Sequence, residues 1–170
     1  MAGEDQLTGE QYVLPTVPVS AGALIFDPRG LLLILKPTYK SGWTIPGGVM
    51  ESDGETPWQA CRREVLEECG LDISNGRLAC VDFRPPRPGS PGGIRFLFDC
   101  GSLTDSALHD IEVQADEIAE YRLVPVAEAL GLLRKPIRRR LRAARTRDGR
   151  PRRGLAYLED GRPVRAVSPS

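Results

Sequence analysis

Short apolar runs separated by turn residues dominate the first 124 positions of the chain. The run at 16–26 is followed by Asp27-Pro28-Arg29-Gly30, a turn-forming tetrapeptide, and then by five consecutive apolar residues at 31–35. This order predicts a β-hairpin with a buried second strand. Further strands are expected at 43–45, 77–83, 94–100 and 118–124.

Helical signals are concentrated in three later segments. Thr56 is a suitable N-cap, Pro57 suits the first helical position and Gly70 is a typical terminator, so we expect a helix over 57–69. Shorter helices are expected at 126–133 and 136–146. Strands and helices mix without a regular βαβ alternation, which favours an α/β sandwich over a doubly wound sheet.

Length and composition are those of one globular domain. The 170 residues are 41% hydrophobic and 27% charged, ordinary values for a soluble protein. We expect an N-terminal arm over 1–13, a folded domain over 14–147 and a basic tail over 148–170. Membrane association is not expected, because no apolar run approaches the roughly 18 residues of a membrane span. The polar first residues resemble no secretory signal, which predicts a cytoplasmic protein.

The four cysteines and the single histidine restrict the chemistry. No two cysteines form a CxxC pair, and His109 is the only histidine. This composition argues against a zinc site of the usual Cys/His kind and against a nucleophile activated by histidine. Four free thiols in a reducing compartment are the expected state.

A net charge of zero conceals two oppositely charged parts. Residues 1–133 hold 10 Lys/Arg and 20 Asp/Glu, a net of −10, whereas residues 134–170 hold 13 and 3, a net of +10. Within the basic part, Ile137, Leu141 and Ala144 keep an apolar helical stripe, so we expect this helix to dock on the acidic body. Nucleic-acid binding and a homodimer contact remain alternatives; without an aromatic residue between 134 and 153 to stack on bases, nucleic acid is disfavoured. A chain ending near residue 147 is therefore expected to keep its activity.

Three carboxylates gather on one face of the helix expected at 57–69. Glu64, Glu67 and Glu68 have i, i+3, i+4 spacing and are therefore neighbours. The core-facing stripe predicted beside them consists of Trp58, Cys61, Val65, Leu66 and Cys69. Clustered like charges are unfavourable, and a hard divalent cation would compensate them, because Mg²⁺ and Mn²⁺ prefer carboxylate oxygens. A solvated acidic face is the alternative interpretation.

The segment GGVMESDGETPWQACRREVLEECGL, residues 47–71, resembles the signature of the Nudix hydrolases. That signature is Gly, five residues, Glu, seven residues and then Arg-Glu-apolar-x-Glu-Glu-x-Gly-apolar, and the match is complete from Glu55 onward. One departure is that six residues rather than five separate Gly48 from Glu55, with the extra residue placed around Ser52-Asp53. The remainder of the chain is similar to small actinobacterial Nudix proteins.

The resemblance implies a Nudix-type α/β/α sandwich with a mixed sheet between helices, and a metal site. The Gly47 carbonyl, Glu64 and Glu68 would bind Mg²⁺ or Mn²⁺, and Glu67 would share a second ion or act through water. A further acidic residue often joins such a site from a later loop. We expect Glu117 in that role before Glu120, with surface charge as the alternative.

The resemblance also implies catalytic and substrate-binding roles. Glu64 is the candidate general base, Glu67 and Arg63 complete the catalytic set, and Glu55 would hold the loop to the helix. Three further candidates lie outside the signature. Lys36 and Arg84 could meet phosphates and Trp43 could stack on a base, although surface roles for the first two and core packing for the third are open alternatives.

The function that follows is metal-dependent hydrolysis of a diphosphate bond in a nucleoside diphosphate linked to another moiety. An ADP-ribose-like compound is placed slightly ahead of a modified nucleoside triphosphate, on a proline at position 86 within a proline-rich stretch. A catalytically idle Nudix domain that senses a nucleotide for regulation is the alternative. The intact set of three glutamates argues against it, since an idle domain has no need of adjacent carboxylates.

Overall fold

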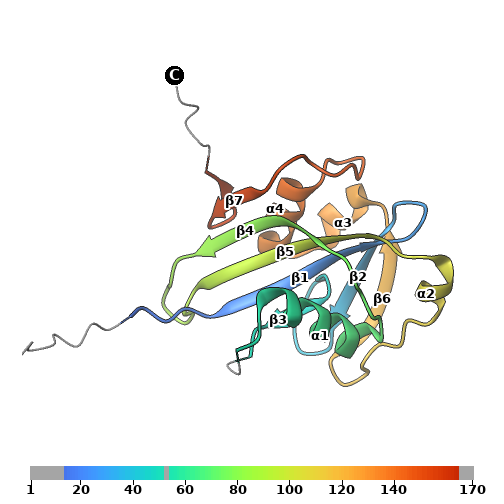
Figure 1. Ribbon diagram of the computed structural model, residues 1–170, viewed down its shortest axis with the longest axis horizontal. Helices are drawn as coiled ribbons and strands as arrows, with labels where there is room; N and C mark the ends of the chain where they lie inside the picture. The colour runs from blue at the N-terminus through green and yellow to red at the C-terminus, as the bar shows by residue number, and fades with distance from the viewer. Residues whose placement is uncertain (1–13, 52–53, 165–170) are drawn as a thin grey trace, which may run out of the picture.

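A computed structural model of the chain describes residues 14–51 and 54–164. Its centre is a mixed sheet with the strand order β6-β2-β1-β5-β4-β7-β8, and β3 pairs with β1 off this path (Figure 1). The strands are β1 (Val19–Phe26), β2 (Leu32–Pro37), β3 (Gly47–Val49), β4 (Arg77–Arg84), β5 (Gly93–Ser102), β6 (Ile118–Val124), β7 (Ala156–Glu159) and β8 (Arg162–Pro163). The β1–β5 and β4–β7 pairs are parallel and the other pairs antiparallel. The expected arm at 1–13 and the extra signature residue at 52–53 lie outside the described residues.

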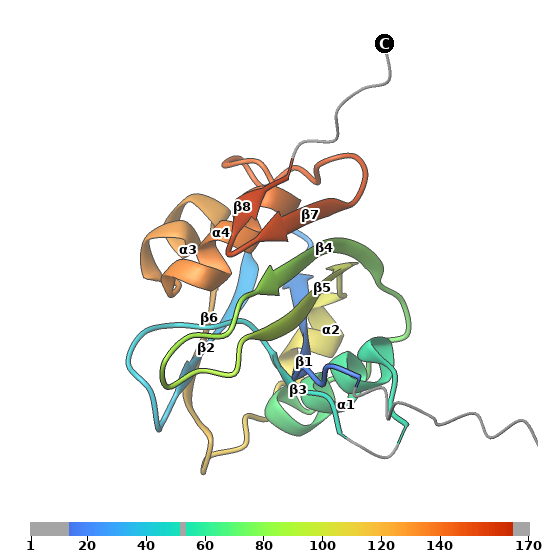
Figure 2. The ribbon, with the colours of Figure 1, turned by 90° about the vertical axis from the view of Figure 1, so that its left-hand side faces the viewer.

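Helices cover both faces of this sheet. Helices α1 (Pro57–Cys69) and α2 (Asp105–His109) lie on one face, and α3 (Val126–Leu132) and α4 (Lys135–Ala144) lie on the other (Figure 2). The expected α/β/α sandwich with a mixed sheet is therefore confirmed. Of the helices within the described ranges, none has the length and apolarity needed to cross a bilayer.

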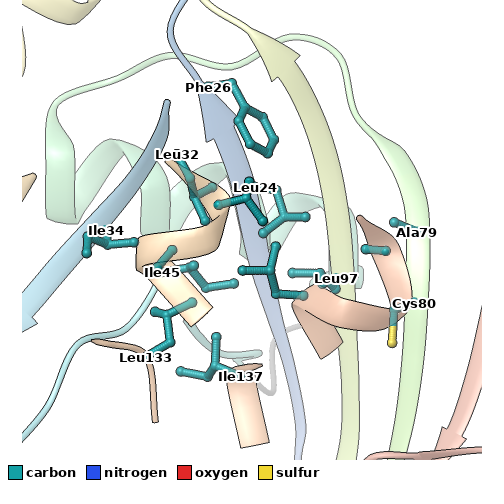
Figure 3. Packing of buried hydrophobic residues seen from close by; sticks show 14 of the residues in the cluster. Leu24, Phe26, Leu32, Ile34, Ile45, Ala79, Cys80, Leu97, Leu133 and Ile137 are labelled. Atoms are coloured by element: carbon teal, nitrogen blue, oxygen red, sulfur yellow. The ribbon is translucent and has the colours of Figure 1, made fainter. Parts of the chain in front are cut away.

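Each face of the sheet has its own apolar core, because side chains alternate along a strand. Leu24 and Ile34 pack toward α3 and α4 with Leu133 and Ile137 (Figure 3). Their neighbours along β1 and β2 pack toward α1 instead, together with Val65. Burial on both faces explains why the sequence of these strands is apolar in nearly every position.

Helix α1 begins and ends where the sequence predicts. The Thr56 hydroxyl accepts a hydrogen bond from the Gln59 N–H, the Gln59 side chain accepts from the Thr56 N–H, and Gly70 ends the helix in the left-handed conformation. The expected core stripe is wrong at one position, because Leu66 is 54% exposed while Glu68 is 5% exposed. The buried face is rotated toward the glutamates, since the helix packs against β1 and β3 together.

Helix α4 docks on the sheet as expected, and its apolar stripe of Ile137, Leu141 and Ala144 is buried. Two ion pairs to buried aspartates accompany the docking. Arg140 Nε lies 2.8 Å from Asp82 Oδ2, and Arg145 Nη2 lies 2.5 Å from Asp99 Oδ1. The helix is thus attached to the acidic body through both its apolar and its charged positions.

The sheet continues past the expected domain boundary at residue 147. Strand β7 pairs in parallel with β4, and Leu158 within it is fully buried in the core that also contains Leu141. Strands β3, β7 and β8 and helix α2 were not expected. The strand expected at 43–45 is reduced to isolated bridges at Trp43 and Thr44, and regular pairing starts at Gly47.

All four cysteines are free thiols, as expected. Cys61, Cys69 and Cys80 are buried, whereas Cys100 is half-buried. His109 is exposed at the end of α2. Neither residue type takes part in the site described next.

Candidate active site

Two glutamates of α1 face the short strand β3, which pairs with β1 and also contacts the helix. The Gly47 N–H donates a hydrogen bond of 2.7 Å to Glu68 Oε2. A Cβ atom at Gly48 would lie inside the van der Waals radius of the Glu64 carboxylate, and one at Gly47 would collide with the Ala21 carbonyl. The glycine pair therefore allows the strand to approach both carboxylates closely.

The guanidinium of Arg63 ties the helix to the preceding loop. Its Nε donates to Glu55 Oε1 at 2.8 Å, and its Nη2 donates to the Val49 carbonyl at 3.0 Å. Its Nη1 donates to Glu64 Oε1 at 2.9 Å and to Glu67 Oε2 at 3.0 Å. This network joins the described part of the loop, at Val49 and Glu55, to the helix.

Burial and crowding perturb the carboxylates that face β3. Burial raises the pKa of Glu68 to about 7; the Gly47 N–H opposes this increase, and the charges of Glu64 and Glu117 add to it. Burial also raises the pKa of Glu64, against the lowering effect of Arg63. Both carboxyls therefore favour the proton more than an exposed glutamate does.

Of the two later acidic residues considered, the structure brings Glu117 to the site. Its charge raises the pKa of both Glu64 and Glu68, and its carbonyl accepts a 2.8 Å hydrogen bond from the Thr38 N–H. Glu120 instead forms an ion pair of 2.6 Å with Arg122 on the same strand. Of the two, Glu117 is therefore the residue whose charge acts on Glu64 and Glu68, and its part in a metal site stays a prediction.

The donor set suits a hard divalent cation. Within residues 14–51 and 54–164, no three acidic, histidine or cysteine side chains converge as a ready-made metal cluster, and Arg63 binds both Glu64 and Glu67. The oxygens beside β3 are nevertheless of the type that Mg²⁺ and Mn²⁺ prefer. A buried carboxylate such as Glu68, surrounded by like charges that raise its pKa, is what a bound cation would stabilise.

A basic cavity of about 340 Å³ opens on the other side of β3. It is lined by Gly47 and Gly48 and by cationic side chains from the β2–β3 loop, β4, β5, the N-cap of α4 and α4 itself, namely Lys40, Arg84, Arg95, Arg134 and Arg140. Arg84 is the one predicted substrate-binding residue that the cavity contains. The carboxylates of Glu64 and Glu68 and a basic cavity thus adjoin along one strand.

The structure places the two other predicted substrate residues elsewhere. Lys36 is exposed on β2, opposite Glu120 of β6. Trp43 is 8% exposed and belongs to the apolar core, and the guanidinium of Arg122 lies 4.6 Å from its ring centroid. Neither residue lines the basic cavity.

Several residues of the cavity were missed at the level of the sequence. Arg95, Arg134 and Arg140 belong to it, and the Arg134 Nε is buried without a hydrogen-bond partner among the described residues. Burial and then the charges of Glu68 and Glu117 raise the pKa of the hydroxyl of Tyr39, which precedes Lys40 in the β2–β3 loop. The change from net negative to net positive charge at residue 134 was the sequence signal that could have pointed to the arginines at the start of α4 and within it.

Gly48→Ala is expected to reduce kcat at least tenfold without unfolding the protein. The new Cβ would displace only the end of the Glu64 side chain, since the Gly48 backbone does not require a positive φ. Gly131→Ala in α3 is the matched control, because a Cβ there meets nothing within 4 Å. Steady-state kinetics and thermal melts of both variants test this expectation, and wild-type kcat in Gly48→Ala would contradict the proposed position of Glu64.

Comparisons with known proteins agree with this geometry. A model of the NUDIX domain matches residues 16–144. A MutT-like protein from Streptomyces ambofaciens is 33% identical over 86 residues, which are 51% of this chain and 53% of that protein. An RNA pyrophosphohydrolase from Hydrogenovibrio crunogenus is 42% identical over 60 residues, 35% of each chain.

A solved structure extends the similarity to most of the fold. The MutT protein from Methanosarcina mazei Go1 superposes with a TM-score of 0.63 at 26% identity, and the match covers 74% of this chain and 90% of that chain. The two curated relatives are matched over less of their length, about half of the first and about a third of the second.

Proposed function

The chain belongs to the NUDIX domain family, and we propose that it is a pyrophosphohydrolase that uses a divalent cation. Its substrate would be a nucleoside diphosphate linked to another moiety, either ADP-ribose-like or a modified nucleoside triphosphate. The observation that carries this proposal is the adjacency of the Glu64–Glu68 pair and the basic cavity across β3. A diphosphate is strongly anionic, so a carboxylate site can accept it only when a cation lies between the two.

The cation would be held by Glu64, Glu68 and the Gly47 carbonyl, with Glu67 and Glu117 available for a second ion. Mg²⁺ or Mn²⁺ at this position supplies charge neutralisation and lowers the pKa of an attacking water. The Gly47 N–H fixes one oxygen of Glu68, which leaves the other oxygen for a ligand. Arg63 would orient Glu64 and Glu67 through its Nη1.

Glu64 is the proposed general base. It is half-buried, and burial raises its pKa, so its carboxylate takes a proton more readily than an exposed one does. Arg63 at 2.9 Å holds the carboxylate in place and stabilises its ionised form. Proton uptake next to the cation site is the step that this residue would perform.

The basic cavity would bind the phosphates and the leaving group. Lys40, Arg84, Arg95 and Arg140 approach it from four elements, so an anionic ligand would be contacted on several sides. Phe96 is the one aromatic residue of its lining among the described residues. Charge rather than base stacking is therefore the proposed basis of affinity. The four free thiols fit a reducing compartment, such as the expected cytoplasm.

A substrate screen tests the proposal directly. The purified protein is incubated with ADP-ribose, nucleoside triphosphates, dinucleoside polyphosphates and 5′-triphosphorylated RNA, with Mg²⁺ or with Mn²⁺, and products are identified by mass. We expect cleavage between two phosphorus atoms that stops on addition of excess chelator. Tight nucleotide binding with no turnover of any compound would favour the idle nucleotide-sensing alternative, and activity that survives the chelator would overturn the cation assignment.

A further inference from the structure

A second basic cavity, of about 390 Å³, lies next to the first. Its lining comes from the start of α4, the end of β4 and the β7–β8 turn, and Figure 2 shows β7 and β8 beside α4. Arg84 and Pro136 line both cavities. The remaining cationic side chains of the second cavity are Arg87, Lys135, Arg139 and Arg162.

The acidic residues of this second cavity are already engaged. Asp82 accepts hydrogen bonds of 2.8 Å from Arg140 Nε and from the Gly161 N–H. Asp160 pairs with Arg87 at 2.6 Å, and its carbonyl accepts a bond of 2.8 Å from Arg139 Nη1. The carboxylates therefore position the walls of the cavity.

Three of the cations have no such partner. Across the described residues, the side chains of Arg84, Lys135 and Arg162 make no hydrogen bond and no ion pair. Like charges are also crowded next to Arg84 in the first cavity, where burial and then the charges of Arg140 and Arg84 lower the pKa of Arg95. Five cations against two engaged carboxylates leave the cavity with excess positive charge.

The first turn of α4 adds to this excess. It contains no acidic residue, and no side chain caps its N–H groups. The N-terminal end of a helix carries partial positive charge, which favours acids there and disfavours Lys135 and its neighbouring arginines. A bound anion would compensate all of these charges together.

We propose that this second cavity is a phosphate-binding subsite, which takes a phosphate group that the substrate carries beyond the scissile diphosphate. The inference rests on the proposed function, because the substrate enters through the adjoining first cavity. Arg84 stands between the two cavities and would contact both phosphate groups. The subsite favours substrates with a longer phosphate chain, such as a dinucleoside tetraphosphate, over ADP-ribose, which has no phosphate beyond its diphosphate.

Binding of inorganic tripolyphosphate tests the subsite without any turnover. Calorimetry is carried out on the full chain with excess chelator, so that no cation links the ligand to the carboxylates. The double variant Lys135→Ala/Arg162→Ala is expected to bind about tenfold more weakly, because each contact of a cation with phosphate is a charge-assisted hydrogen bond. Both side chains are exposed and unpaired, so the fold should be retained.

Arg147→Ala/Arg153→Ala is the matched control, because it removes the same charge from two exposed arginines outside both cavities. We expect its tripolyphosphate affinity to remain within twofold of wild type. An equal loss in the two double variants would show that only the net charge matters and would overturn the proposal.

Kinetics then distinguish a phosphate of the substrate from a free phosphate ion. In Lys135→Ala/Arg162→Ala we expect KM for diadenosine tetraphosphate to rise about tenfold at unchanged kcat, while KM for ADP-ribose stays within twofold of wild type. Weaker tripolyphosphate binding with both KM values unchanged would overturn the assignment to the substrate. Failure of the proposed function would appear as absence of turnover in the wild type, with tripolyphosphate binding still measurable.

Discussion

Glu64→Gln and Glu68→Gln are each expected to lower kcat by about 10²–10⁴-fold, the usual scale for the loss of a positioned acid–base group. Glutamine keeps the size of the side chain and removes the charge that would hold a cation or accept a proton. In Glu68→Gln the amide oxygen can still accept the Gly47 N–H. The hydrogen bond to β3 should therefore survive.

The melting temperatures of the variants show whether a loss of kcat comes from lost chemistry or from a damaged fold. Burial and like charges raise the pKa of Glu68, so a neutral side chain there should leave the metal-free melting temperature unchanged or higher. Glu128→Gln, at an exposed position of α3, is the matched control and should keep wild-type kinetics. Wild-type kcat in both active-site variants would refute the assignment of the site.

Local signals explain why α1 could be predicted from the sequence. Its N-cap, its proline at the first position and its terminating glycine all act within a few residues of the helix ends. The rotation of its buried face could not be predicted in the same way. Leu66 is exposed and Glu68 is buried because of where β1 and β3 lie, and that arrangement depends on pairing between distant segments.

The carboxylate half of the proposed site could be predicted from the sequence because its glutamates lie on one helix, at spacings that the helix itself defines. Of the basic half only Arg84 was predicted, since Arg84, Arg95 and Arg140 come from three elements that meet only in the folded protein. For Trp43, the sequence alone could not distinguish packing in the core from stacking on a base. An aromatic residue beside a glycine is typical of both a core and a stacking site, and only the burial of its ring distinguishes them.

Leu158→Ala is expected to lower the free energy of unfolding by about 2–5 kcal/mol, the range measured for truncation of fully buried leucines. Leu158 is completely buried on β7 and lies opposite Asp82 of β4. At this chain length, a loss of 1 kcal/mol lowers the melting temperature by about 2–4 °C. The variant should therefore melt at least about 4 °C below wild type.

Leu155→Ala is the matched control, because Leu155 precedes the same strand and is exposed. Its unfolding free energy should change by no more than about 0.5 kcal/mol. A chain ending at Arg147 would lose Leu158 and also the Gly161 N–H that bonds to the buried Asp82, so it should melt lower still and lose activity at moderate temperature. This reverses the expectation drawn from the basic sequence after residue 147. Equal melting of Leu158→Ala and Leu155→Ala, or full activity of the shortened chain, would show that β7 is not part of the folding unit.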